Sequence, residues 1–151
     1  MDKLSIKDEN SLKEAINLQK QECNEEAISI LNELIKYNPS NPKIISFLGL
    51  FLSKTENYRE AIPYLEEARI LKPKSELLAL SLYISYTEQE KYQKAFNTLF
   101  DYLEEYPANL FKDTLEELLE GLLNNYGSTY KKKILFYSKK NDITIPDELI
   151  E

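Results

Sequence analysis

The chain has 151 residues, of which 42% are hydrophobic and 30% are charged, the balance of a soluble globular domain with its own core. Its net charge of −7 repels nucleic-acid phosphates, and no run approaches the roughly 20 apolar residues that a membrane-spanning helix needs. Neither a nucleic acid nor a membrane is therefore expected among its partners.

The residues that most often carry catalysis or bind metals are scarce. The chain has no histidine, which removes the commonest general base and transition-metal ligand, and its single cysteine, Cys23, cannot form an internal disulfide. Its three glycines are too far apart to form a phosphate-binding loop. We therefore expect no metal and no cofactor. Residues 1–7 lack the apolar core of a secretory signal, so a cytoplasmic location is expected.

The expected elements are helices, because apolar residues recur every three or four positions between turn-forming segments. In chain order the helices are expected at 8–20, 25–37, 42–54, 58–71, 76–89, 92–106, 110–124 and 128–140. Prolines mark the turns, as in the segment Asn38–Pro42, because proline cannot continue a helix and restrains the residue before it.

Five series of residues recur at a constant interval of 34 residues. The series are Ala27, Ala61 and Ala95; Ile28, Ile62 and Phe96; Leu31, Leu65 and Leu99; Pro39, Pro73 and Pro107; and, in two copies only, Tyr58 and Tyr92. Alanine permits a close approach of two helices, and the leucine four positions later lies on the same helical face. Duplication of one helical hairpin explains why the five series stay in step.

The segment 57–73, from Asn57 to Pro73, resembles the second helix of a tetratricopeptide repeat (TPR), a family of 34-residue helical hairpins. The resemblance implies an all-α fold, an α-α superhelix or solenoid. We expect one domain over residues 1–151, with TPR hairpins at 8–41, 42–75 and 76–109 and a degenerate capping helix pair at 110–151. Glu14 stands where the family has leucine, so the first helix is expected to be frayed or shifted.

The helix at 110–124 departs from the repeat. Its apolar side holds Phe111, Leu115, Leu118, Leu119 and Leu122, and its acidic side holds Asp113, Glu116, Glu117 and Glu120. In the numbering of the repeat the four acids fall at core positions, so the register must slip or the helix must act as a terminal cap. We interpret the acids as a solvated face, with a contact surface for a basic partner as the alternative. The lysines at 131–133 and 139–140 are likewise interpreted as solvated.

In the TPR family the first helix of each hairpin, the A helix, lines the concave face, where partners usually bind. The corresponding residues here are Leu12, Ile16, Lys43, Ser46, Leu50, Ser53, Leu77, Leu80, Ile84, Thr87 and Phe111. Such an apolar concave groove suits an amphipathic helix or an extended peptide with large apolar anchors. The alternative is that these residues pack against the protein's own helices.

The expected function is binding of another protein, as an adaptor or as a chaperone resembling those of bacterial secretion systems. An immunity protein that neutralises a secreted toxin and a self-associating structural subunit are the alternatives. An enzyme is not expected, because adjacent carboxylates such as Glu66 and Glu67 point about 100° apart on a helix and do not converge.

Overall fold

A computed structural model describes residues 3–150, and over this range the chain forms eight α-helices and two 3₁₀-helices but no β-strand. The all-α prediction is confirmed. The elements are α1 (Ile6–Lys20), α2 (Asn24–Tyr37), α3 (Pro42–Lys54), α4 (Tyr58–Leu71), α5 (Glu76–Glu88), α6 (Tyr92–Glu105), α7 (Phe111–Leu123), η1 (Ser128–Tyr130), α8 (Lys131–Lys140) and η2 (Asp147–Leu149). None of the helices in this range is long and apolar enough to span a membrane.

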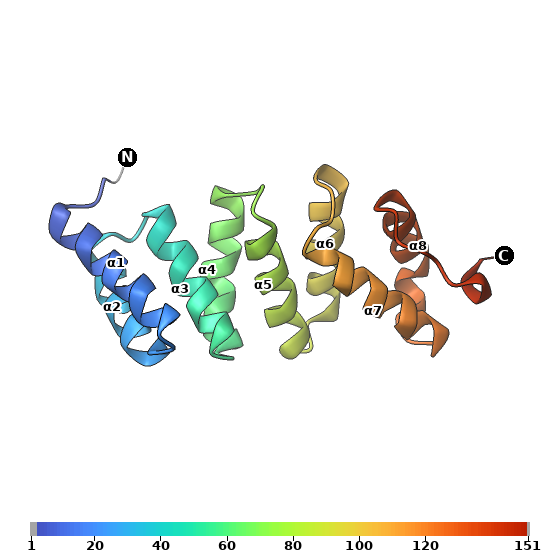
Figure 1. Ribbon diagram of the computed structural model, residues 1–151, viewed down its shortest axis with the longest axis horizontal. Coiled ribbons are helices and arrows are strands. Elements are labelled where there is room, and N and C mark those ends of the chain that lie inside the picture. Colours follow the sequence, from blue (N-terminus) through green and yellow to red (C-terminus); the bar gives the residue numbers. More distant parts are fainter. Residues whose placement is uncertain (1–2, 151) are drawn as a thin grey trace.

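The helices form hairpins that stand side by side in one elongated row, from α1 and α2 at one end to α7 and α8 at the other (Figure 1). Each hairpin packs on the next, through α2 against α3 and through α4 against α5. This is an α-α superhelix, in which every unit except the end units is covered by a neighbour on both sides.

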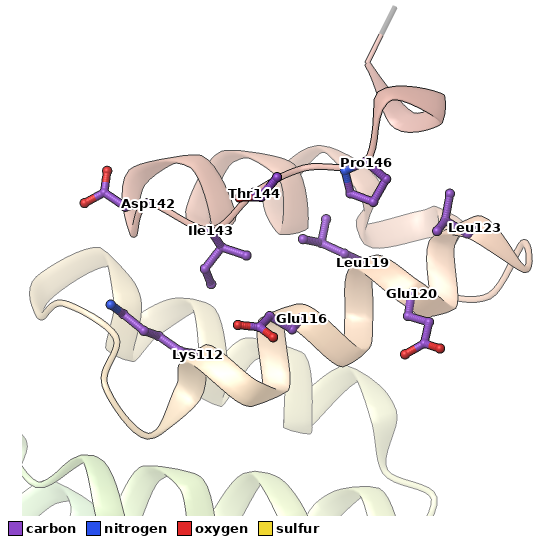
Figure 2. Close-up of a pocket in the computed structure, with 9 residues that line it drawn as sticks. All are labelled: Lys112, Glu116, Leu119, Glu120, Leu123, Asp142, Ile143, Thr144 and Pro146. Carbon is purple, nitrogen blue, oxygen red and sulfur yellow. The ribbon is translucent and has the colours of Figure 1, made fainter.

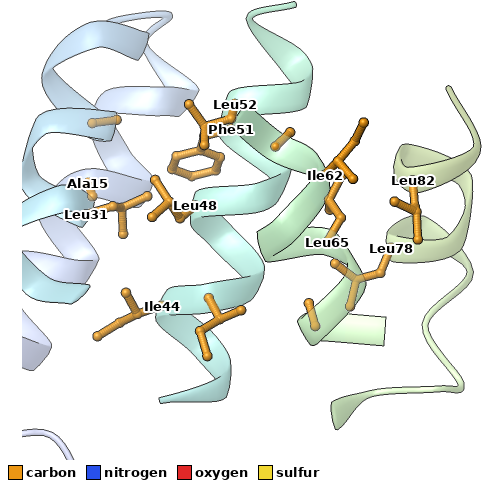
Figure 3. Packing of buried hydrophobic residues seen from close by; sticks show 14 of the residues in the cluster. Ala15, Leu31, Ile44, Leu48, Phe51, Leu52, Ile62, Leu65, Leu78 and Leu82 are labelled. Carbon is orange, nitrogen blue, oxygen red and sulfur yellow. The ribbon is translucent and has the colours of Figure 1, made fainter. Parts of the chain in front are cut away.

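Two clusters of buried apolar residues follow one another along the row. Figure 3 shows Leu31 of α2 directed toward α3, and Ile62 and Leu65 of α4 directed toward Leu78 and Leu82 of α5. The repeated alanines of α2, α4 and α6 are fully buried, as expected where two helices approach closely.

Each of the first three hairpins closes with the same turn, in which a glutamate adopts the left-handed conformation. Glu22, Glu56 and Glu90 have φ angles of 63°, 64° and 57°. The amide after each glutamate donates a 2.8 Å hydrogen bond to a carbonyl five positions earlier. The bonded pairs are Cys23 with Leu18, Asn57 with Leu52, and Lys91 with Tyr86. The 34-residue period thus extends to the backbone of the turns.

We expect Glu56→Gly to raise the free energy of unfolding by about 0.5–1 kcal/mol, because glycine has no Cβ to resist a positive φ. Urea denaturation measures the change. Glu60→Gly is the matched control, since it removes the same side chain from an exposed position inside α4. It should lower stability by about 1 kcal/mol. A loss of stability in Glu56→Gly would contradict the expectation.

The first helix is not frayed, contrary to the expectation from Glu14. α1 runs unbroken from Ile6 to Lys20, and the Ser5 side chain caps it by accepting a 3.1 Å hydrogen bond from the Asp8 amide. Glu14 is simply exposed, while Leu12 and Ala15 are buried. Because α1 lies at the end of the row, it has a neighbouring hairpin on one side only, and only a narrow part of its surface is buried.

Candidate protein-binding face

Helix α5 carries the most exposed aliphatic side chains of the predicted face. Leu77 is 50% exposed and Ile84 is 37% exposed. Leu80 lies between them on the same side and is half-buried, as is Thr87 one turn further on. The Thr87 hydroxyl donates a 2.8 Å hydrogen bond to the Ile84 carbonyl. We call these four residues, Leu77, Leu80, Ile84 and Thr87, the α5 stripe.

Helix α3 offers less of the predicted face. Lys43 is exposed and Leu50 is half-buried, but Ser46 and Ser53 are buried. The Ser46 hydroxyl donates a 2.7 Å hydrogen bond to the Pro42 carbonyl, and the Ser53 hydroxyl accepts one of 3.2 Å from Ser85. Both hydroxyls are therefore hydrogen-bonded within the protein's own helices, which corrects the prediction that they face a partner.

At the ends of the predicted face the outcome is mixed. Ile16 is half-buried against the core, whereas Leu12 is a core residue with almost no exposed surface. Because Leu12 points inward in α1, a partner could not contact its side chain, and the prediction for Leu12 is corrected.

Phe111 is fully buried, so the prediction that it extends the partner-binding face is wrong. Its ring meets the ring of Tyr83 nearly edge-on, with centroids 6.1 Å apart, and lies 5.6 Å from the ring of Tyr102. The physical reason is a change of register in α7. The side of α7 that would face a partner in a regular repeat packs inward, together with Leu115 and Leu119.

The four predicted acids of α7 are all exposed, so the register slip also keeps them out of the core. Glu116 and Glu120 line a hollow that α7 forms with the segment after α8 (Figure 2). Leu119 and Ile143 lie across it from one another, whereas the carboxylates of Glu120 and Asp142 point away from it. The hollow was missed in the sequence because it depends on where the C-terminal segment crosses α7.

Glu117 belongs to a different environment from Glu116 and Glu120. Burial raises the pKa of Tyr83 to about 12, and the negative charge of Glu117 contributes to this shift. Glu117 therefore lies close enough to Tyr83 of α5 for its charge to affect the pKa of that side chain. Asp113 is not among the residues that line the hollow. The acidic side is thus divided between two surroundings.

No protein-family model and no curated protein matches the sequence. A solved structure described as "MamA RS-1 ArsTM double mutant" does match, with a TM-score of 0.70, over 89% of this chain and 77% of that chain. MamA contains tetratricopeptide repeats. The fold is a TPR-like helical repeat. Because the two chains share only 16% identity, the similarity shows the fold alone.

In this TPR-like chain, the A helices α1, α3 and α5 hold the predicted face. The predicted residues that keep accessible surface are Ile16, Lys43, Leu50, Leu77, Leu80, Ile84 and Thr87. The accessible part is thus aliphatic and is concentrated on α5.

Proposed function

We propose that this chain binds another polypeptide on its A-helix face, as an adaptor or as a chaperone for an apolar segment, with the α5 stripe as the main contact. The observation that carries the proposal is the exposure of Leu77 and Ile84 on a helix whose other side is well packed. Leu78 and Leu82, on that other side, are buried. Aliphatic side chains grouped in this way lose water when a partner covers them.

The spacing of the stripe favours an elongated partner. Leu77 and Ile84 are seven positions apart, which is about 10.5 Å along a helix. Apolar anchors at positions i and i+7 of a partner helix have the same spacing, so an amphipathic helix can contact both residues at once. Lys43, exposed on α3, places a positive charge on the same predicted face.

The test is affinity capture of partners from native lysate with the wild type and the variant Leu77→Asp/Ile84→Asp. We expect the main captured polypeptide to fall by roughly tenfold or more, because burying an unpaired carboxylate costs more than about 1.4 kcal/mol. Both positions are exposed, so folding should be retained, which circular dichroism checks.

The matched control is Ile70→Asp/Leu71→Asp. It makes the same change at two exposed apolar residues of α4, which is not an A helix. This variant should capture the partner as the wild type does. Equal capture by all three proteins, or no specific polypeptide with any of them, would contradict the proposal.

An immunity protein that neutralises a basic secreted toxin is the second candidate. It is supported by the acidic side of α7, where Asp113, Glu116, Glu117 and Glu120 are exposed; within residues 3–150 the one ion pair lies elsewhere, between Glu33 and Lys36. Binding through this side would weaken steeply with salt and with Glu116→Lys/Glu120→Lys, but not with Leu77→Asp/Ile84→Asp. The two candidates are thus separated by which variant loses the partner.

A further inference from the structure

The outer side of α8 is basic and apolar at the same time. Ile134 and Ser138 are buried, and the opposite side of the helix carries Lys132, Leu135, Phe136 and Lys139. Phe136 is 60% exposed. We call these four residues the α8 stripe. Leu135 and Lys139 also line a hollow with apolar residues of the C-terminal segment, which are Ile143, Ile145, Leu149 and Ile150.

The two lysines of the α8 stripe, Lys132 and Lys139, form no ion pair within the described chain. α8 contains five lysines and no acid, and the one ion pair among residues 3–150 does not involve them. Lys133 and Lys140 lie over the rings of Phe100 and Tyr137, away from the stripe. Lys132 and Lys139 are exposed, with apolar Leu135 and Phe136 between them. An acidic and apolar surface is the complement that such a stripe requires.

The opposite end of the row has such a surface. On α2, Glu26, Ile30, Glu33 and Tyr37 follow one another on one side of the helix, and Tyr37 is 77% exposed. We call them the α2 stripe. Ile30, Glu33 and Tyr37 line a hollow with Lys7, Asp8 and Ser11 of α1, and no residue of the second hairpin lines it. Glu26, together with Ile28, lines a separate hollow that reaches Thr55 and Asn57 of the second hairpin. The part of the α2 stripe formed by Ile30, Glu33 and Tyr37 therefore lies at the end of the row, beside Lys7 of α1, where no hairpin precedes α1 and α2 (Figure 1).

The two stripes match in spacing and are opposite in charge. Glu26 and Glu33 are seven positions apart, as are Lys132 and Lys139, so each pair spans about 10.5 Å along its helix. Ile30 and Tyr37 supply apolar surface on one stripe, and Leu135 and Phe136 on the other. Lys36 pairs with Glu33 at 2.9 Å, but both side chains are more than 60% exposed, so this bond is weak and easily exchanged.

We propose that a second copy of this chain docks its α2 stripe on the α8 stripe, so that the molecules join head to tail. Such a contact uses two different surfaces and leaves one of each free, so it extends the row of hairpins instead of closing a dimer. This inference does not depend on the proposed function, because neither stripe includes a residue of the α5 stripe.

Light scattering during gel filtration tests the proposal with the wild type and two charge-reversed variants. The wild type should exceed the mass of a monomer by about twofold or more at high concentration and low salt, and return to it in high salt. Lys132→Glu/Lys139→Glu has two acidic ends and Glu26→Lys/Glu33→Lys has two basic ends, so each alone should remain a monomer. A mixture of the two should associate, because their unlike ends match.

The control is Lys54→Glu/Lys72→Glu, which makes the same charge change at two exposed positions outside both stripes and should associate like the wild type. A wild type that remains monomeric at its highest soluble concentration overturns the proposal, even if the α8 stripe retains a foreign acidic polypeptide. The proposal is also overturned if the two charge-reversed variants associate like the wild type. It is overturned as well if a mixture of the two variants stays monomeric. Loss of the α5 partner in Leu77→Asp/Ile84→Asp bears on the proposed function alone.

Discussion

Phe111→Ala is expected to lower the free energy of unfolding by about 3–5 kcal/mol, the usual cost of truncating a fully buried phenylalanine. The ring fills the space between α5, α6 and α7, where it contacts the rings of Tyr83 and Tyr102. Removing it leaves a cavity in the core that joins α5 and α6 to α7. Urea denaturation followed by circular dichroism measures the loss.

The neighbouring residue provides the control for this prediction. Leu110 is exposed, so Leu110→Ala should change stability by no more than about 0.5 kcal/mol. The pair also separates two roles of Phe111. If Phe111→Ala left stability unchanged and instead weakened partner binding, Phe111 would be a residue of the binding face, as its place in the repeat predicted, and the described packing of α7 would be wrong.

Gly49→Val is expected to destabilise the protein by about 1–3 kcal/mol through overpacking. An added Cβ at Gly49 would lie 2.9 Å from Leu65 Cδ2 and 3.2 Å from the Leu65 backbone nitrogen. The backbone of α4 cannot move away without separating α3 from α4. The substitution therefore disturbs the hairpin next to α5, and thermal unfolding should begin at a lower temperature.

Gly121 is the matched control for Gly49. A Cβ at Gly121 would come no closer than 3.7 Å to its nearest neighbour, Tyr126 Cβ, so it fits without strain. We expect Gly121→Ala to stabilise α7 by about 0.5–1 kcal/mol, because alanine is the better helix former. If Gly49→Val and Gly121→Ala had the same effect, the close approach of α3 and α4 would not limit the side chain at position 49.

Several features of the fold could be predicted because they repeat. The alanine, leucine and proline series at an interval of 34 residues gave helix ends that agree with α2 to α6 within one residue. Local rules suffice there, since proline ends a helix and alanine permits close packing wherever they occur. The left-handed glutamates of the turns were not predicted, because that conformation is usually marked by glycine.

The candidate site was predicted only in part. Repeat positions placed Leu77 and Ile84 correctly on the accessible side of α5, but gave the same role to Leu12 and Phe111, which are buried. A repeat position fixes which side of a helix faces its own hairpin. It does not fix what covers the other side, and at the two ends of the row the neighbours differ from those of an internal hairpin.

The sequence alone determines that this protein is a row of helical hairpins. Each hairpin depends on contacts between residues that are close together in the chain, so local sequence is sufficient to specify it. Tertiary structure alone decided the rotation of α7, the burial of Phe111 and the hollow beside Glu116. The burial of Phe111 depends on α7 packing against Tyr83 of α5 and Tyr102 of α6. The hollow depends on the C-terminal segment crossing α7 after the period has ended. Without a repeat to follow, α7 turned inward the side that carries Phe111, Leu115, Leu119 and Leu122, because burial of apolar side chains is favourable.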